Sequence, residues 1–366
     1  MRKTTRKTSL IRAALPVAAF GLVLLTGCTS GAGSASSTDG GSGQAHVATV
    51  PGGPNPYFDS WGDAITQAGE DFDIAEVVNE VPPSITFSLD VQNSTINALA
   101  GRGFNAFAIF PDDASGSNTQ MQQLADRGIP SISVAGCTND PTPALFCLAT
   151  DVKQGSYEST KYAIDKMGGK GTLAFLTGFL TDPNTQLRIQ GAEQAVAETN
   201  GAVTLVQTIT DVDTPDAARP AVENLLSAQG STLGGIVAQS YYAAEGVAAV
   251  MLDQPQYRNI VTVLEDDSPS VMKALGEGAI TATMWQNPYG QAYLAGYILN
   301  KIVAEGCTVA SDAPFLSTTQ TSKFVNSGFA IIDSENYDEY KDGPYSVPTE
   351  TEKVKQNLDE NILSCD

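Results

Sequence analysis

The side chains of this chain that could do chemistry are hydrogen-bonding and aromatic groups that directly follow short apolar runs. They are Asn55, Tyr57, Phe58, Asp112, Asp113, Phe179, Ser240, Glu265, Asp266, Asp267, Trp285 and Gln286. His46 is the single histidine, which argues against a histidine-based triad, general base or metal cluster. We identify no nucleophile–base pair. These residues therefore indicate binding rather than a chemical step.

Alternating strands and helices are expected to position these residues. Strands are predicted at 46–50, 75–78, 106–110 and 129–134, with helices at 61–70, 91–101 and 121–127 between them. The pattern then restarts, with helices at 157–167, 188–198, 215–228 and 242–252, and strands at 172–176, 202–206, 235–238, 260–264 and 279–284. We expect Thr214 to be the N-cap of the helix at 215–228. This order predicts two successive α/β units, each with a parallel sheet covered by helices.

The predicted sheets also explain why the polar and aromatic groups gather after the strands. In open α/β sheets, ligands bind outside the carboxyl ends of the strands. Each of the residues named above stands at such an end. The sequence therefore predicts a ligand site built from both units.

Length and charge set further limits. The chain has 366 residues, enough for two domains of ordinary size. Its formal net charge of -21 disfavours nucleic acid and anionic membranes as partners. The same charge is also consistent with a role in solubility alone.

The first residues predict export. A basic segment (Arg2, Lys3, Arg6, Lys7 and Arg12) precedes an apolar run at 13–25 that is short for a membrane span. The segment LTGC, ending at Cys28, resembles the lipobox of bacterial lipoproteins, which implies a lipid anchor on Cys28. An ordinary secretion signal with a chance cysteine is the alternative. We assign 1–27 to the signal peptide and 28–44 to a flexible Gly/Ser-rich tether.

Four further cysteines suit an oxidising compartment. Three pairings are possible. Cys137 and Cys147 enclose a short proline-containing loop, which favours their pairing and leaves Cys307 with Cys365. Scattered positions give little support for metal binding, and we expect no metal and no cofactor.

Six motifs in order resemble the type I periplasmic sugar-binding proteins, the ribose- and galactose-binding group of ABC importers. They are NPYF, AIFPDDAS, LRIQGAEQAV, VAQSYYAAEGV, TVLEDDSPSV and TATMWQNPYGQAY. Together the six motifs extend over nearly all of the chain after the tether.

The resemblance implies an α/β fold of two Rossmann-like lobes with parallel sheets, joined by a three-strand hinge. Hinge crossings are expected near Ala135-Gly136, near Gln286-Asn287 and at 311–319. The N-lobe would comprise 45–136 plus 288–313, and the C-lobe 137–286 plus 314–366.

The resemblance also implies aromatic contacts for a sugar, whose C–H faces suit aromatic rings. Tyr57 and Phe58 would form one wall, although either ring could instead pack in the core. Phe179 would add an apolar contact from the C-lobe. Trp285 would either stack on the ligand or fill the core.

Polar groups would bind the hydroxyls, which both donate and accept. Asp113 matches the family's sugar-binding carboxylate, with Asp112 as a possible cap of the next segment. Arg188 matches the family arginine, whose fork suits two hydroxyls, and a surface salt bridge is its alternative. The remaining expected contacts are Asn55, Ser240, Tyr241, Glu265, Asp266 and Gln286.

Ser240, Tyr241 and Glu265 depart from the family pattern, and the cluster of acids leaves room for an amino sugar or another cationic ligand. The implied function is an extracytoplasmic binding lipoprotein that delivers a sugar-like ligand to an ABC permease. It would be a monomer, held at the membrane by its lipid anchor alone. A receptor for a signalling furanone or polyol is the alternative. A glycoside hydrolase with paired aspartates and a sugar-responsive repressor are less consistent with the chain.

Overall fold

The computed structural model describes residues 43–340 and 348–365. The predicted signal peptide, Cys28 and the tether up to residue 42 lie outside the described residues. Within the described ranges, none of the helices is both long enough and apolar enough to cross a bilayer.

The first lobe is built on a six-stranded sheet in the order β12-β5-β4-β3-β1-β2, in which every pairing is parallel. Its strands are β1 (His46–Val50), β2 (Glu76–Asn79), β3 (Ala106–Ile109), β4 (Ser131–Val134), β5 (Cys147–Ala149) and β12 (Phe324–Asn326). Its helices are η1 (Pro56–Phe58), α1 (Asp59–Asp71), α2 (Leu89–Arg102), α3 (Ser117–Ala125), α9 (Pro288–Val303), α11 (Pro348–Asn357) and the π-helix Leu358–Ile362.

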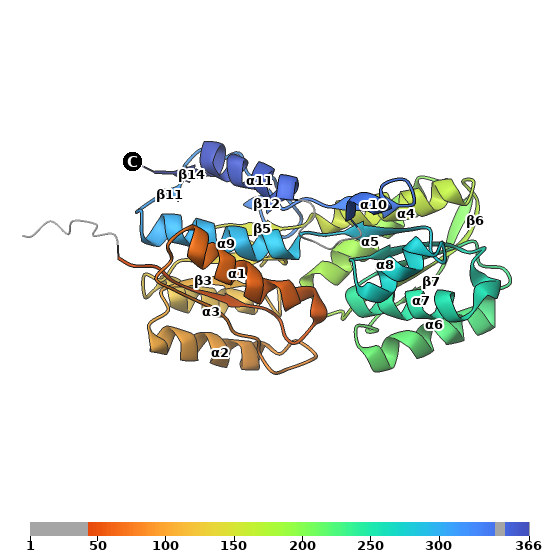
Figure 1. Cartoon of the computed structure of the whole chain (residues 1–366), viewed down its shortest axis with the longest axis horizontal. Coiled ribbons are helices and arrows are strands. Elements are labelled where there is room, and N and C mark those ends of the chain that lie inside the picture. Colours follow the sequence, from red (N-terminus) through yellow and green to blue (C-terminus); the bar gives the residue numbers. More distant parts are fainter. Residues whose placement is uncertain (1–42, 341–347, 366) are drawn as a thin grey trace, which may run out of the picture. The chain divides into compact units, whose positions relative to one another are not determined.

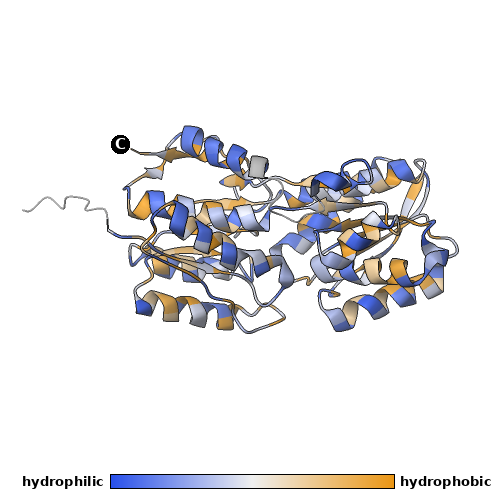
Figure 2. Cartoon of the chain, viewed as in Figure 1, coloured by the Kyte–Doolittle hydropathy of each residue, from blue (hydrophilic) through white to orange (hydrophobic). Residues whose placement is uncertain are grey.

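Both faces of this sheet are covered because successive residues of a strand point to opposite sides. Val47 packs in one cluster with Trp61 of α1, whereas its neighbour Ala48 packs in another with Leu99 of α2. Figure 1 shows α1 and α9 on one side of the sheet and α2 and α3 on the other. Of the strands of this lobe, β3 (AFAI) and β5 (CLA) are apolar throughout, whereas β1, β2, β4 and β12 each include at least one polar residue. Figure 2 shows both orange and blue segments on the helices that cover the sheet.

The second lobe repeats this plan with the sheet order β13-β10-β9-β8-β6-β7, in which only β13 runs antiparallel to its neighbour. Its strands are β6 (Gly171–Thr177), β7 (Val203–Ile209), β8 (Gly235–Gln239), β9 (Val261–Glu265), β10 (Ala282–Trp285) and β13 (Ala330–Asp333). Its helices are α4 (Val152–Lys166), α5 (Pro183–Ala197), α6 (Pro215–Gln229), α7 (Tyr241–Asp253), η2 (Pro255–Tyr257), α8 (Pro269–Gly276) and α10 (Tyr337–Tyr340).

The predicted fold class is confirmed, with two lobes of mostly parallel sheets. Most element bounds shift by a few residues. The helix predicted at 157–167 begins earlier, at Val152, because Asp151 caps it by accepting from the Gln154 N–H. Thr214 is the N-cap residue of α6 as expected, but its side chain makes no capping hydrogen bond.

The lobe boundaries differ from the expected ones. Since β5 and β12 both belong to the first sheet, the chain crosses between lobes at 150–151 and at 327–329, rather than near Ala135-Gly136 and at 311–319. The third crossing, between β10 and α9, runs through Gln286-Asn287. The helix α11 packs against α9, so the C-terminal segment belongs to the first lobe and not the second. The three-residue strand β5 is too short for its pattern to predict.

Two disulfides lie in the first lobe, in the pairing that the sequence favours. Cys137–Cys147 closes the loop between β4 and β5. Cys307–Cys365 ties the segment after α9 to the C-terminus, where β11 (Thr308–Val309) pairs with β14 (Leu363–Ser364). Both bonds therefore keep chain segments within one lobe instead of joining the two.

Candidate ligand-binding site

A narrow cavity of about 40 Å³ lies at the carboxyl ends of the strands, between residues of both lobes. The first lobe supplies Asn55, Tyr57, Phe58, Phe87 and Phe110. The second supplies Asp182, Asn184, Arg188, Asp213, Ser240, Tyr241, Glu265 and Asp266, and Gln286 comes from a hinge crossing. The two walls differ in character, since one is mainly aromatic and the other mainly charged.

The aromatic wall is held by the turn after β1. Pro56 begins the short helix η1, and the Asn55 side chain caps it by accepting from the Tyr57 N–H at 3.0 Å. Phe58 is only 4% exposed and makes edge contacts with Trp61 and Phe110, at 5.0 and 5.2 Å between ring centroids. Phe58 thus belongs to the core and to the cavity wall at once, so the two alternatives for this ring are not exclusive.

Tyr57 connects the cavity to the hinge. Its hydroxyl donates to Gln291 Oε1 at 2.9 Å, and Gln291 Nε2 donates to Ser327 Oγ at 2.9 Å and Thr150 Oγ1 at 3.3 Å. Thr150 and Ser327 lie at two of the three crossings. Burial of the phenol raises the pKa of Tyr57 well above its usual value, so the hydroxyl stays neutral and remains a donor.

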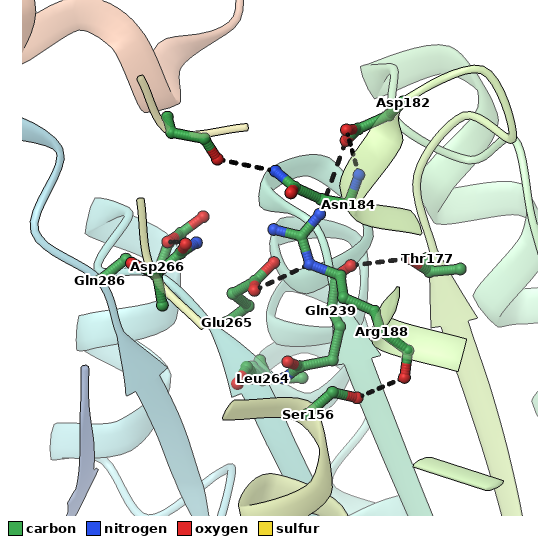
Figure 3. A network of polar contacts seen from close by, with 12 residues as sticks. Ser156, Thr177, Asp182, Asn184, Arg188, Gln239, Leu264, Glu265, Asp266 and Gln286 are labelled. Atoms are coloured by element: carbon green, nitrogen blue, oxygen red, sulfur yellow. Dashed lines mark hydrogen bonds and ion pairs between the residues drawn. The ribbon is translucent and has the colours of Figure 1, made fainter. Parts of the chain in front are cut away.

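Arg188 is the centre of the charged wall (Figure 3). Its Nε donates to Glu265 Oε1 at 3.1 Å, and its Nη1 lies 3.6 Å from Asp182 Oδ2. Helix α5 fixes its position, because Ser156 Oγ donates to the Arg188 carbonyl at 2.7 Å and Gly191 lets α5 approach the Lys153 carbonyl of α4. Burial alone would lower the pKa of Arg188, but the neighbouring carboxylates raise it, so the guanidinium stays charged.

Four buried carboxyls surround this guanidinium: Asp182, Asp213, Glu265 and Asp266. Desolvation raises the pKa of each, to about 6 for Asp182. Arg188 opposes the shift at every one of them without cancelling it. One positive charge is thus shared among four acids.

Asp266 is held in an uncommon backbone conformation, with φ of 63°. Its N–H donates to the Met284 carbonyl at 2.8 Å, and its own carbonyl accepts from Thr283 Oγ1 at 2.7 Å. Gln286 Nε2 donates to Asp266 Oδ1 at 3.0 Å. Strand β10 and the hinge crossing therefore fix this carboxylate at the cavity.

Comparisons with known proteins identify the family of the chain. A family model described as a periplasmic binding protein domain matches residues 47–306. The chain belongs to this family. Since the family model describes periplasmic binding proteins and the relatives are named as binding proteins, the prediction that the chain binds a ligand and is not an enzyme is confirmed.

Two relatives of this periplasmic binding protein are named for small polyhydroxylated ligands. It is 25% identical over 275 residues to a xylitol-binding protein of Mycolicibacterium smegmatis, covering 74% of this chain and 77% of the relative. It is also 25% identical over 263 residues to a D-apiose import binding protein of Actinobacillus succinogenes, covering 71% and 82%.

Solved structures share the fold. A solute-binding protein of Burkholderia graminis in complex with D-arabinose matches with a TM-score of 0.71 at 21% identity, over 82% of this chain and 98% of that one. A solute-binding protein of Bacillus halodurans with bound myo-inositol matches with a TM-score of 0.70 at 18% identity, over 83% and 99%. The two-lobe architecture is therefore that of known binding proteins.

Nine of the residues predicted for the site of this periplasmic binding protein line the one cavity: Asn55, Tyr57, Phe58, Arg188, Ser240, Tyr241, Glu265, Asp266 and Gln286. Asp113, Asp112, Phe179 and Trp285 do not line it. Arg188 is no surface salt bridge, because its side chain is only 7% exposed.

The capping role expected for Asp112 is taken by Asp113, and neither aspartate lines the cavity. Asp113 is exposed, and its Oδ1 accepts from the N–H groups of Ser115 and Gly116, so it caps the turn before α3. Asp112 is buried and accepts from Gln92 Nε2 at 3.0 Å. Desolvation raises the pKa of Asp112 to about 8, so it is largely protonated at neutral pH.

The two other predicted aromatic residues pack on protein. Trp285 is 2% exposed in the core of the second lobe, with its ring 6.1 Å from that of Tyr340. Phe179 is half-buried and makes an edge contact with Phe87 of the first lobe, at 5.8 Å between centroids. This pair joins the lobes beside the cavity.

Five cavity residues were missed: Phe87, Phe110, Asp182, Asn184 and Asp213. Three of them could have been found by the signal used for the others, a position after the carboxyl end of a strand. Phe110 follows β3, Asp182 follows β6 and Asp213 follows β7. Phe87 lies in the long connection between β2 and α2, with a φ of 46°. No periodic pattern points to such a residue.

Proposed function

We propose that this chain is the extracytoplasmic solute-binding component of an ABC importer, and that it captures a monosaccharide or related polyhydroxylated molecule between its lobes. The observation that carries the proposal is the pairing of an aromatic wall with a charged wall in one cavity. Rings suit the C–H face of a sugar, while carboxylates, amides and a guanidinium suit its hydroxyls. The names of the two curated relatives support the same ligand class.

Binding would proceed without a chemical step. The ligand would favour the state in which both walls contact it, and the hinge crossings would allow the lobes to approach. Exclusion of water would strengthen the hydrogen bonds at the cavity. The closed form would then present both lobes to the permease and release the ligand intact.

The proposal includes a lipid anchor on Cys28 and a monomeric binding protein held at the outer face of the cell membrane. Mass spectrometry of the N-terminal peptide from the producing cell should show a diacylglycerol on Cys28. A Cys28→Ala variant should leave the membrane fraction. Retention of this variant in the membrane would refute the anchor without affecting the ligand proposal.

The ligand proposal is tested by a thermal-shift screen against pentoses, hexoses, polyols, amino sugars and nucleosides, followed by calorimetry on each hit. We expect saturable stabilisation by at least one polyhydroxylated compound, and recovery of that compound unchanged. Chemical turnover of a hit, or stabilisation by nucleosides alone, would contradict the proposal.

A further inference from the structure

The cavity has an unbalanced charge. Arg188 forms ion pairs with Asp182 and Glu265, whereas Asp213 and Asp266 have no ion-pair partner among the described residues. Their hydrogen-bond donors are neutral: Asn55 Nδ2 and the Tyr242 N–H for Asp213, and Gln286 Nε2 for Asp266. Amide donors stabilise a buried carboxylate less than a cation does.

One buried oxygen at the cavity also lacks a donor. Glu265 is fully buried, and its Oε1 accepts from Arg188, but its Oε2 accepts no hydrogen bond within the described part of the chain. An unsatisfied buried acceptor is costly, and more so when it is ionised. Because Glu265 lines the cavity, a ligand is placed to supply the missing donor.

A second cavity, of about 310 Å³, is also lined by acidic side chains. It shares Tyr57, Tyr241 and Asp266 with the ligand cavity, and it adds Asp59, Asp63 and Asp267. No lysine or arginine is among the described residues that line it. A recess lined by one sign of charge concentrates ligands of the opposite sign.

We infer that the natural ligand carries a protonated amine beside its hydroxyls, as an amino sugar or amino polyol does, and that Asp266 binds the ammonium group. Glu265 Oε2 is the second acceptor for this group. The inference rests on the proposed function and specifies its ligand class. A neutral sugar would leave the carboxyl groups of Asp213 and Asp266 without a cation.

Proton release provides an independent test. The charged groups that act on Asp266 are Glu265, Asp267 and Arg188, with the phenols of Tyr57 and Tyr241 beside them. Desolvation followed by repulsion from Glu265 and Asp267 raises the pKa of Asp266 well above its usual value. An ammonium group at this carboxyl lowers that pKa again, so binding should release protons into the buffer at neutral pH.

The experiment compares matched ligand pairs by calorimetry at about pH 7.5: glucosamine with glucose, galactosamine with galactose, and 1-amino-1-deoxysorbitol with sorbitol. We expect the amine of at least one pair to bind at least about tenfold more tightly than its hydroxyl partner. N-acetylation of that amine should abolish the gain. The binding enthalpy should vary with the ionisation enthalpy of the buffer, as proton release requires.

The matched variants are Asp266→Asn, which removes the charge at the cavity, and Asp113→Asn, which removes an exposed charge outside it. Asp266→Asn should bring the amine-to-hydroxyl affinity ratio close to one, whereas Asp113→Asn should leave it unchanged. Preference for the neutral member of every pair would overturn the inference and leave the proposed function standing. Absence of binding by every compound would contradict both.

Discussion

The two walls of the cavity place their groups by different means. The aromatic wall of the first lobe is continuous with its hydrophobic core: Phe58 contacts Trp61 and Phe110, and Phe87 contacts Phe110 at 5.3 Å between centroids. The charged wall of the second lobe consists of acids around Arg188 that are held by ion pairs and hydrogen bonds. The first wall therefore gains stability from burial, while the second loses stability through desolvation that only partners or a ligand can offset.

The largest effect is expected from Arg188→Ala. It leaves Glu265 and Asp182 buried without their cation, so we expect the free energy of unfolding to fall by ~3–5 kcal/mol and ligand-induced stabilisation to disappear. Denaturant unfolding and thermal shift measure the two effects. Arg219→Ala is the control, because its pairs with Glu223 and Asp253 are exposed and should contribute less than ~1 kcal/mol. Equal losses of stability in the two variants would show that the buried ion pairs of the charged wall contribute no more than exposed ones.

A pH scan of the ligand-free protein should give the next largest effect. Asp182 ionises near its usual pKa in the unfolded chain, but its pKa in the folded protein is about 6, and those of Asp213, Glu265 and Asp266 are also raised. Between the pKa of each group in the unfolded chain and its pKa in the folded protein, the folded state binds more protons than the unfolded state. The free energy of unfolding should therefore fall as pH rises. We expect the Tm to decrease by on the order of 5 °C from about pH 5 to pH 8.

The scan has an internal control in Asp266→Asn. This variant should flatten the decrease, because one of the titrating groups is gone. Asp140 and Asp333, whose pKa values are lowered by hydrogen bonds that outweigh desolvation, lose their stabilisation only on acidification below that window. A Tm that rises from about pH 5 to pH 8 would contradict the description of the second wall.

Tyr57→Phe tests the aromatic wall and should have a smaller effect. It keeps the ring but leaves Gln291 Oε1 without its donor, so we expect a loss of ~1–2 kcal/mol in unfolding free energy. Tyr157→Phe is the matched control, since the Tyr157 hydroxyl donates to Glu198 at an exposed site. If the unfolding free energy falls equally in the two variants, the hydrogen bond from Tyr57 to Gln291 stabilises the protein no more than an exposed one does.

The smallest effect is expected from Asp113→Asn, although the family resemblance predicts that this residue binds the sugar. The amide oxygen can still accept from the N–H groups of Ser115 and Gly116, so stability should change by less than ~0.5 kcal/mol. Ligand affinity, measured by calorimetry, should remain that of the unaltered protein. A large loss of affinity would show that Asp113 takes part in ligand binding.

The alternation of strands and helices, and the edge at which polar groups gather, could be predicted from the sequence alone. Apolar runs separated by helical periodicity are local properties, and the carboxyl ends of parallel strands share one edge by geometry. The order of residues along the chain is therefore enough to assign Tyr57 and Glu265 to one site, whereas Arg188 was assigned to it by the family resemblance. The disulfide partners also follow from spacing, because a loop as short as that between Cys137 and Cys147 favours local pairing.

Only the tertiary structure decided which lobe each late segment joins and which member of a neighbouring pair turns inward. β5 and β12 are three residues long, and their place in the first sheet depends on hydrogen bonds to distant strands. Asp112 is buried and Asp113 exposed because the turn before α3 orients the two side chains differently, and no periodicity encodes that choice. Phe87 reaches the cavity from the long connection between β2 and α2 through contacts with Phe110 and Phe179, which single-sequence patterns do not contain.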